Sequence, residues 1–324
     1  MLVLHAGLPK AGSSAIQHGL DRHAATLSDM GVHYAVIDET RPGHREPVTS
    51  GNGIRLARYL NPRRRPSDFR IEAFEASFDR LYVSPAHPVS VISSEFLAYA
   101  EGDMLQRFRD RVLRGREVKV VGFIRDLYGH ARASWMQLVK RGAYTRSFEH
   151  FADRLYVNSQ GRALRTFVKA FGWASVEFIH YETHAHDIFG TFLGAIGSSA
   201  IAAFRPPLVN RSLSRTELEV QLLLNRIHHN KALATAVSDH FLLCRPEVRG
   251  ARIWRPQVAL SLASRFAEDV RWINERYFQD PDRLAIARPE TRHFSGAEES
   301  YPRVLAEAVT VLGRRLGAGA PAFH

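Results

Sequence analysis

The sequence predicts an α/β protein in which helices flank a parallel β-sheet and a mostly helical C-terminal lobe follows. Three observations predict it. Short apolar runs alternate with segments of helical spacing, a glycine-containing loop follows the first run, and the pattern beyond residue 213 is almost wholly helical. Because the runs lack polar alternation, they favour strands buried on both faces, as in a covered parallel sheet.

Five apolar runs are the candidate strands: 1–8, 32–37, 89–93, 118–124 and 176–180. The segments of helical spacing between or after them are 13–29, 71–82, 97–113, 129–141, 148–156 and 162–171. Residues 38–70 carry four prolines and many arginines without sustained periodicity. We expect this stretch to be a mobile excursion close to the substrate.

The expected domain boundary lies near residue 205, where Arg205 precedes the pair Pro206 and Pro207. Residues 1–205 would form a nucleotide-binding core, and residues 206–324 a helical lobe packed on it. A Pro-Pro pair can equally be a kink inside one compact fold, so that alternative stays open. At 324 residues and 45% hydrophobic content, either arrangement can bury a core.

Composition narrows the class of protein. Cys244 is the single cysteine, which excludes an intrachain disulfide framework. The start of the chain lacks the features of a signal peptide and no run reaches 18 apolar residues, so we expect a cytoplasmic protein without a transmembrane segment. The formal net charge of +11 indicates either a polyanionic partner or merely a basic surface.

A phosphate-binding loop is predicted between the first strand and the first helix. Gly7, Gly12 and Ser14 fit the pattern G-x-x-x-x-G-K-[ST], but Ser13 stands in the lysine position and the lysine is inside the loop, at Lys10. Backbone N–H groups and the helix dipole favour an anion at such a turn. The fold is therefore expected to be P-loop-like. The alternative is a plain strand-to-helix connection, and Ser13 and Ser14 can also cap the helix.

The stretch HAGLPKAGSSAIQ resembles the P-K-x-G-[ST]-[ST] loop of the sulfotransferases that use 3′-phosphoadenosine 5′-phosphosulfate (PAPS). The resemblance implies PAPS as cofactor and adenosine 3′,5′-bisphosphate as product. It implies a 5′-phosphosulfate site made by Pro9, Lys10, Ala11, Gly12, Ser13 and Ser14. A sulfuryl group carries less negative charge than a phosphoryl group, so no metal is expected, and Lys10 would help the bridging oxygen leave.

A second segment, 118–142, resembles the 3′-phosphate site of the same family. Arg125 ends a strand and Ser134 lies on the next helix, in a pattern R-x8-S-x-x-Q-x-x-K that Gln137 and Lys140 complete. The pattern is closest to a bacterial branch that modifies carbohydrates. Arginine offers a planar fork of donors to a phosphate.

Both motifs contain departures and have simpler explanations. Ala11 stands where threonine or glycine is common, and Trp135 where tyrosine is frequent. Arg125 could instead form a strand-end ion pair with Asp126, with Ser134 merely facing a neighbouring helix.

Glu95 is the predicted catalytic base because it ends a strand at the same sheet edge as the loop. The alternative is a helix-start acid, with Ser93 or Ser94 as the cap. His44, in the excursion, is the second candidate base. The histidines His180, His184 and His186 lack an acidic partner at helical spacing, so they do not predict a metal site.

Arg211 lies in an N-R-S-L segment, 210–213, that resembles a late motif of these enzymes. It would meet the 3′-phosphate or an acidic acceptor. A helix cap by Ser212 or Ser214 ahead of Glu217 explains the same residues without a ligand.

Taken together, the motifs predict a PAPS-dependent sulfotransferase that moves the sulfuryl group by in-line transfer to a hydroxyl of a carbohydrate or glycolipid, which can be acidic. Two alternatives remain: a P-loop kinase or other nucleoside triphosphatase, and a non-catalytic anion- or polysaccharide-binding protein on the same fold. Nucleic acid is not an expected partner, because no recognition motif accompanies the basic residues. The acceptor's identity and the oligomeric state do not follow from the sequence.

Overall fold

The computed structural model describes residues 1–36, 51–198, 211–248, 250–251, 253–278 and 300–317. These form two compact units. The core unit comprises the described residues of 1–126, 158–206 and 266–285, and the helical unit those of 127–157, 207–265 and 286–324. Residues 127–157, expected in the core, thus group with the C-terminal helices. The predicted boundary near residue 205 lies outside the described residues.

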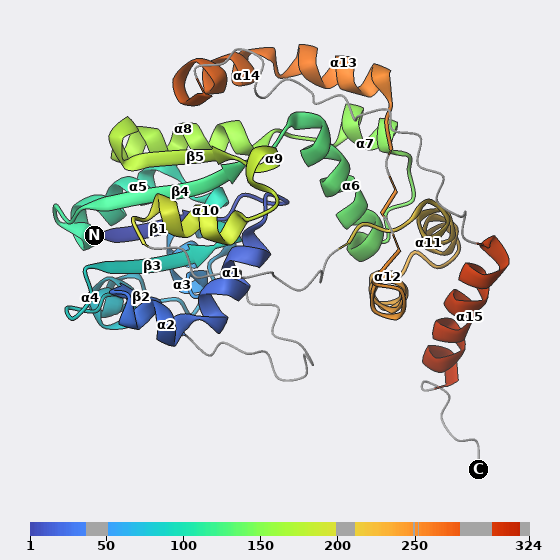
Figure 1. The fold of residues 1–324 in the computed structure, drawn as a ribbon, viewed down its shortest axis with the longest axis horizontal. Coiled ribbons are helices and arrows are strands. Elements are labelled where there is room, and N and C mark those ends of the chain that lie inside the picture. The colour runs from blue at the N-terminus through green and yellow to red at the C-terminus, as the bar shows by residue number, and fades with distance from the viewer. Residues whose placement is uncertain (37–50, 199–210, 249, 252, 279–299, 318–324) are drawn as a thin grey trace. The chain divides into compact units, whose positions relative to one another are not determined.

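The core unit is built on a five-stranded parallel sheet with the strand order β2-β3-β1-β4-β5 (Figure 1). Its strands are β1 (Leu2–Ala6), β2 (Val32–His33), β3 (Val89–Ser94), β4 (Val118–Ile124) and β5 (Val176–His180). Every residue of β1 is buried, as expected for the central strand of a sheet covered on both faces. The predicted fold class and all five predicted strands are confirmed.

The strand register determines which residues meet at the carboxyl edge of the sheet. Ala6 of β1 lies opposite Ser94 of β3, and Ile124 of β4 lies opposite His180 of β5. The next residues along the chain therefore emerge at one edge, which is where parallel sheets bind ligands.

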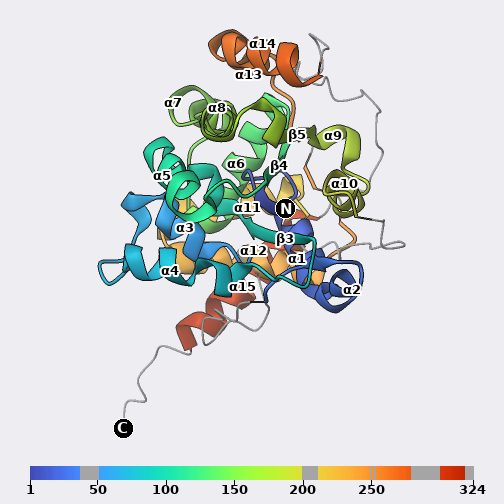
Figure 2. The same ribbon diagram turned by 90° about the vertical axis from the view of Figure 1, so that its left-hand side faces the viewer.

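Helices cover both faces of this sheet. Figure 2 shows α1, α2 and α10 on one side and α3, α4, α5 and α8 on the other. The helices of the core unit are α1 (Ser13–Arg22), α2 (Ala24–Asp29), α3 (Ile54–Leu60), α4 (Ile71–Tyr82), α5 (Gly102–Arg107), α8 (Ser159–Phe171), α9 (Tyr181–His184), α10 (Ile188–Ala195) and α14 (Ala267–Ile273). Shorter 3-10 and π-helical segments are η1 (Pro62–Arg64), η2 (Glu95–Tyr99), η3 (Phe108–Leu113), η4 (Trp173–Ser175) and η5 (Asn274–Phe278).

Part of the predicted mobile excursion is an ordered piece of the core. Helix α3 buries Leu56, Ala57, Tyr59 and Leu60. Just before it, the Asn52 side chain donates to the Val91 carbonyl and accepts from the Ser93 N–H, at 3.0 and 2.8 Å. The expectation of a mobile excursion is therefore wrong for residues 52–60, because Asn52 is bound to β3 and α3 is packed in the core. Residues 37–50 lie outside the described part of the chain.

The helical unit contains α6 (Leu127–Gly142), α7 (Phe148–Arg154), α11 (Arg215–His228), α12 (Lys231–Cys244), α13 (Pro256–Arg265) and α15 (Tyr301–Gly317). Helix α6 packs against α11 and α12. Asn225 of α11 donates from Nδ2 to the Val139 and Tyr144 carbonyls, at 2.9 and 3.0 Å. These contacts explain why α6 groups with the C-terminal helices rather than with the sheet.

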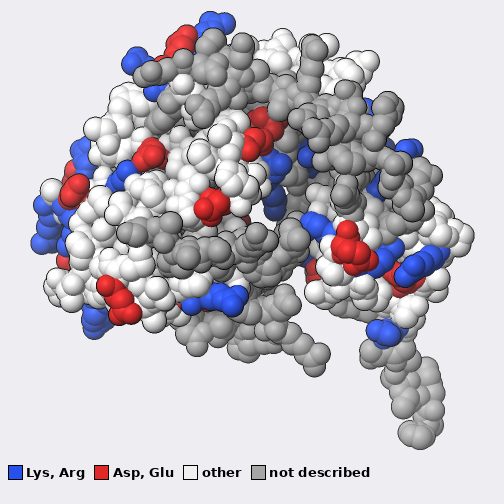
Figure 3. All heavy atoms as spheres, viewed as in Figure 1, with Lys and Arg blue, Asp and Glu red and all other residues white. Residues whose placement is uncertain are grey.

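Charged side chains of both signs lie on the face that Figure 3 shows. Several arginines of the core unit have acidic partners. Arg116 contacts Asp79 at 2.7 Å, and Arg107 contacts Glu75 at 2.6 Å. Within the described residues, no helix is both long and apolar enough to cross a membrane.

Candidate functional site

The loop between β1 and α1 is fixed against the end of β3. The Gly7 N–H donates to the Ser94 carbonyl at 3.1 Å. A Cβ atom at Gly7 would lie 3.0 Å from the Cα of Glu95 and 2.8 Å from the Oγ of Ser13, which is too close for any larger residue without movement. The loop and Glu95 are therefore neighbours at the carboxyl edge of the sheet, as the sequence predicted.

Helix α1 starts without a side-chain cap. Its N-cap is Gly12, with a φ of 87°, and a Cβ atom there would lie 2.6 Å from the Ile188 side chain. The Ser13 hydroxyl donates to the Leu8 carbonyl at 3.1 Å, and Ser14 is exposed. The alternative prediction that Ser13 or Ser14 caps the helix is thus wrong, because the Ser13 hydroxyl stabilises the loop instead. The uncapped first N–H groups and the dipole of α1 suit an anion.

Lys10 adopts a left-handed backbone conformation with a φ of 62°. For a residue with a Cβ atom this costs about 1–2 kcal/mol. The Lys10 carbonyl accepts a hydrogen bond from Nη1 of Arg125 at 3.0 Å. The second predicted motif thus contacts the first, and Arg125 helps to hold the loop in its strained conformation.

Arg125 is itself held by several contacts. Its backbone N–H donates to Oε1 of Gln160 at 2.8 Å, and its carbonyl accepts from Nε2 of Gln160 at 2.9 Å. Its Nε donates to Oε1 of Glu182 at 3.1 Å, and its guanidinium lies 4.7 Å from the ring centre of Tyr181. The strand-end ion pair considered as an alternative does exist, but its acid is Glu182.

Glu182 is a functional candidate that the sequence reasoning missed. Its Oε2 accepts from the Asp126 N–H at 3.3 Å and lies 3.7 Å from Nε2 of His180. Burial, with the neighbouring Asp126 carboxylate, raises the pKa of Glu182 to about 7, although Arg125 opposes the shift. Its signal in the sequence was an acid just after β5, at the edge where Arg125 follows β4.

Gln160 was missed as well. Its side chain is 1% exposed and it makes the two hydrogen bonds that a neighbouring strand would make with Arg125. An amide near the start of a helix gives no sign of such a role in the sequence. Its partner is 35 residues away.

Glu95 is the first residue of η2 and is half-buried. The Ser94 hydroxyl accepts from the Phe96 N–H at 3.2 Å, so Ser94, one of the two predicted caps, caps this helix. The structure thus gives Glu95 a position at the helix start as well as beside the loop. The two positions are compatible, and the role of Glu95 as base stays a prediction.

A buried histidine lies at the same end of the sheet. Nδ1 of His5 lies 2.7 Å from the Ser93 hydroxyl across the β1–β3 pair, and burial lowers the pKa of His5 to about 3. His5 is therefore neutral, and it links the two strands that carry the loop and Glu95.

Ser134, Gln137 and Lys140 lie on α6, in the helical unit. Ser134 and Gln137 are half-buried, whereas Lys140 is buried. Trp135, the departure from the family pattern, is buried and donates from Nε1 to the Arg146 carbonyl at 3.1 Å. The motif is thus on one helix, as predicted, and its contact with a cofactor stays a prediction.

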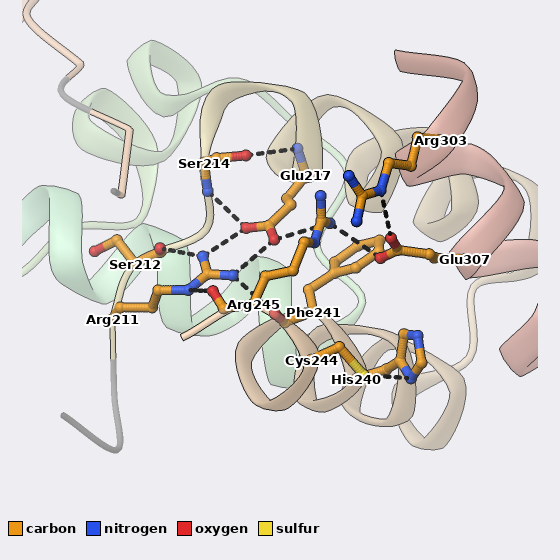
Figure 4. A network of polar contacts seen from close by, with 10 residues as sticks. All are labelled: Arg211, Ser212, Ser214, Glu217, His240, Phe241, Cys244, Arg245, Arg303 and Glu307. Carbon is orange, nitrogen blue, oxygen red and sulfur yellow. Dashed lines mark hydrogen bonds and ion pairs between the residues drawn. The ribbon is translucent and has the colours of Figure 1, made fainter. Parts of the chain in front are cut away.

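Arg211 has a structural role. Figure 4 shows its guanidinium against Glu217, whose side chain is fully buried, and the two form bonds of 2.7 Å from Nη1 and Nη2. Its remaining donors bind the backbone carbonyls of Ser212, Phe241 and Arg245. Ser214 and Glu217 form the capping box that was the alternative explanation of this segment. Because all five N–H donors of Arg211 are engaged, the geometry does not favour it as a cofactor ligand.

His44, the second candidate base, lies outside the described residues. Among the described residues, no group of three or more His, Cys, Asp or Glu side chains is arranged to hold a metal ion. His180, His184 and His186 are described residues, and they belong to no such group.

Comparison with known proteins finds a solved structure with partial similarity of fold. No family model matches the chain, and no curated protein matches it. A crystal structure of a sulfotransferase from Alicyclobacillus acidocaldarius superposes with a TM-score of 0.47 at 15% sequence identity, covering 84% of this chain and 94% of that one. A likeness of this degree assigns neither function nor substrate.

Proposed function

We propose that this chain is a PAPS-dependent sulfotransferase that transfers a sulfuryl group to a hydroxyl, with a carbohydrate or glycolipid as acceptor. One observation carries the proposal: Arg125 of the 3′-phosphate motif donates to the carbonyl of Lys10 in the 5′-phosphosulfate motif, at 3.0 Å. Arg125 and the loop of Lys10, predicted separately from the sequence, thus meet at one edge of a parallel sheet.

The residues of the loop fit such a cofactor. Gly7 and Gly12 stand where a Cβ atom would collide with neighbouring groups, so the loop backbone is tightly packed, and no side chain caps the N–H groups at the start of α1. Arg125 uses Nε and one N–H of Nη1 within the protein, which leaves donors on Nη1 and Nη2 for a phosphate. Ser134 would add a hydroxyl from α6.

The serine at position 13 favours a sulfotransferase over a P-loop kinase. In a P-loop kinase the residue after the second glycine is a lysine that reaches the terminal phosphates. Here that position is Ser13, whose hydroxyl is used on the Leu8 carbonyl. The lysine of this segment is instead Lys10, inside the loop.

When bound, PAPS supplies a sulfuryl group joined to a phosphate through a bridging oxygen. Lys10 would place its ammonium where negative charge develops on that oxygen during in-line transfer. Glu95, beside Gly7, would accept the proton of the acceptor hydroxyl. Arg125 would orient the nucleotide while holding Lys10 in place. The cytoplasm stays the expected location.

The test is transfer of radioactive sulfur from labelled PAPS to a panel of saccharides in the presence of EDTA. We expect label in saccharide that depends on Lys10. Transfer of phosphate from ATP with magnesium, without sulfuryl transfer, would instead identify a kinase.

A further inference from the structure

Two arginines near Tyr99 of η2 have no acidic partner among the described residues. Arg64 ends η1, and Arg162 is the fourth residue of α8. Both side chains are exposed, and in the part of the chain that the structure describes no carboxylate lies within 4.0 Å of either guanidinium. Neighbouring arginines differ: Arg63 contacts Glu101 at 3.4 Å.

Arg64 stacks on Tyr99, and the charge of Arg162 also acts on its hydroxyl. The Arg64 guanidinium lies 4.8 Å from the ring centre of Tyr99 and 5.3 Å from that of Phe96. Burial raises the pKa of Tyr99, the Glu95 carboxylate raises it further, and the charges of Arg64 and Arg162 lower it. The predicted base and two cations thus lie within electrostatic reach of one phenol.

The aromatic rings hold Arg64 without using its hydrogen-bond donors. A guanidinium stacked on ring faces keeps its N–H groups at the rim, where they can bind a planar anion in a bidentate manner. Binding an anion then costs little side-chain entropy, because the aromatic rings already position the arginine. This arrangement favours a carboxylate ligand over a neutral one.

The cluster lies at the edge of the sheet that carries the phosphate loop. Helix α8 precedes β5 and runs back along the sheet, so its first turns lie at the carboxyl edge, where Gln160 holds Arg125. Helix η2, which carries Tyr99 and Glu95, contacts both α8 and β1. An acceptor held by Arg64 and Arg162 would therefore lie beside Glu95.

We infer that Arg64, Arg162 and Tyr99 form an acceptor subsite that selects an acidic saccharide, with the two guanidinium groups binding a uronate carboxylate. The inference rests on the proposed function for the choice of a saccharide. Binding of a carboxylate by the two arginines does not depend on the proposed function. A neutral sugar has no group that can pair with these two charges.

The test compares two oligosaccharides of equal length by titration calorimetry at low salt, without nucleotide. The probes are a hyaluronan tetrasaccharide, in which every second residue is a glucuronate, and chitotetraose, which is neutral. We expect the hyaluronan tetrasaccharide to bind at least tenfold more tightly. The double variant Arg64→Gln/Arg162→Gln should lose this preference, whereas Arg63→Gln, which removes the neighbouring arginine paired with Glu101, should keep it.

Equal affinity for the two probes, including no binding of either, overturns the inference, and so does a preference that survives in the double variant. Circular dichroism of each variant excludes unfolding as the cause. Binding of adenosine 3′,5′-bisphosphate is measured separately. If the nucleotide binds but the preference is absent, the acceptor subsite is wrong while the proposed function stands; if the preference is present but the nucleotide does not bind, the reverse holds.

Discussion

Nη1 of Arg125 donates a hydrogen bond to the backbone carbonyl of Lys10, 115 residues earlier in the chain, at a distance of 3.0 Å. The contact joins the end of β4 to the loop after β1. Under the proposed function, one arginine would bind the 3′-phosphate and also hold the loop that would bind the 5′-phosphosulfate.

Replacing this arginine should therefore affect both phosphates. In Arg125→Lys, one ammonium cannot pair with Glu182, hold the Lys10 carbonyl and bind a phosphate together. We expect affinity for adenosine 3′,5′-bisphosphate to fall at least tenfold in titration calorimetry. Arg116→Lys, which changes an arginine paired with Asp79 before β4, is the control and should bind normally. Unchanged affinity in Arg125→Lys would remove Arg125 from the site.

Lys10 should matter for turnover more than for binding. The ammonium is expected to act on charge that develops during transfer, so Lys10→Ala should lower kcat by about 10²–10³. The dissociation constant of adenosine 3′,5′-bisphosphate should change much less, because this product lacks the sulfuryl group. Steady-state kinetics and calorimetry on the same variant separate the two effects. Normal turnover in Lys10→Ala contradicts the proposed role.

Glu95→Gln separates a catalytic carboxylate from a helix-start residue, because glutamine keeps the size and loses the basic oxygen. We expect kcat to fall about a hundredfold or more, with nucleotide affinity near that of the wild type. His44→Ala is the matched comparison. If Glu95→Gln stays active while His44→Ala is inactive at unchanged stability, the base is His44.

Glu182 should make the stability of the core depend on pH. Its pKa in the folded protein, about 7, lies above its ordinary value of 4.5, so the folded state binds the proton more tightly. The stabilisation is complete below about pH 4.5 and is lost as the pH rises through 7. A difference of this size is equivalent to about 3 kcal/mol.

Urea unfolding at pH 5 and pH 8 measures this dependence. The free energy of unfolding of the wild type should fall between the two pH values by more than that of Glu182→Gln. Glu177→Gln, which changes an acid of β5 paired with Lys119 at 2.7 Å, should behave as the wild type does. Identical pH dependence in the wild type and Glu182→Gln would show that Glu182 is not protonated in this range.

The sheet could be predicted because a strand that is buried on both faces consists of a short run of consecutive apolar residues, such as that of β1. Helix α3 could not. It is seven residues long, and its burial depends on contacts of Asn52 with β3, about 40 residues away. Nor could the grouping of α6 with the C-terminal helices, which depends on Asn225 reaching its backbone.

The candidate site also contains residues that could be predicted from the sequence and residues that could not. Lys10 and Arg125 lie in contiguous motifs, so their positions could be predicted, although their contact could not. Gln160 and Glu182 were missed because each acts on Arg125 from a distant part of the chain. Arg211 was assigned from a short motif, and only the structure shows its donors engaged by Glu217 and three carbonyls.

The most direct test of the central claim is thermal unfolding with adenosine 3′,5′-bisphosphate or with 5′-AMP, both in EDTA, and separately with ATP and magnesium. Adenosine 3′,5′-bisphosphate at one hundred times its dissociation constant should stabilise the protein by about 2.7 kcal/mol without metal. At the same concentration 5′-AMP should stabilise it much less, because it lacks the phosphate that Arg125 is proposed to bind. Equal stabilisation by 5′-AMP, or stabilisation by ATP with magnesium alone, would contradict the account.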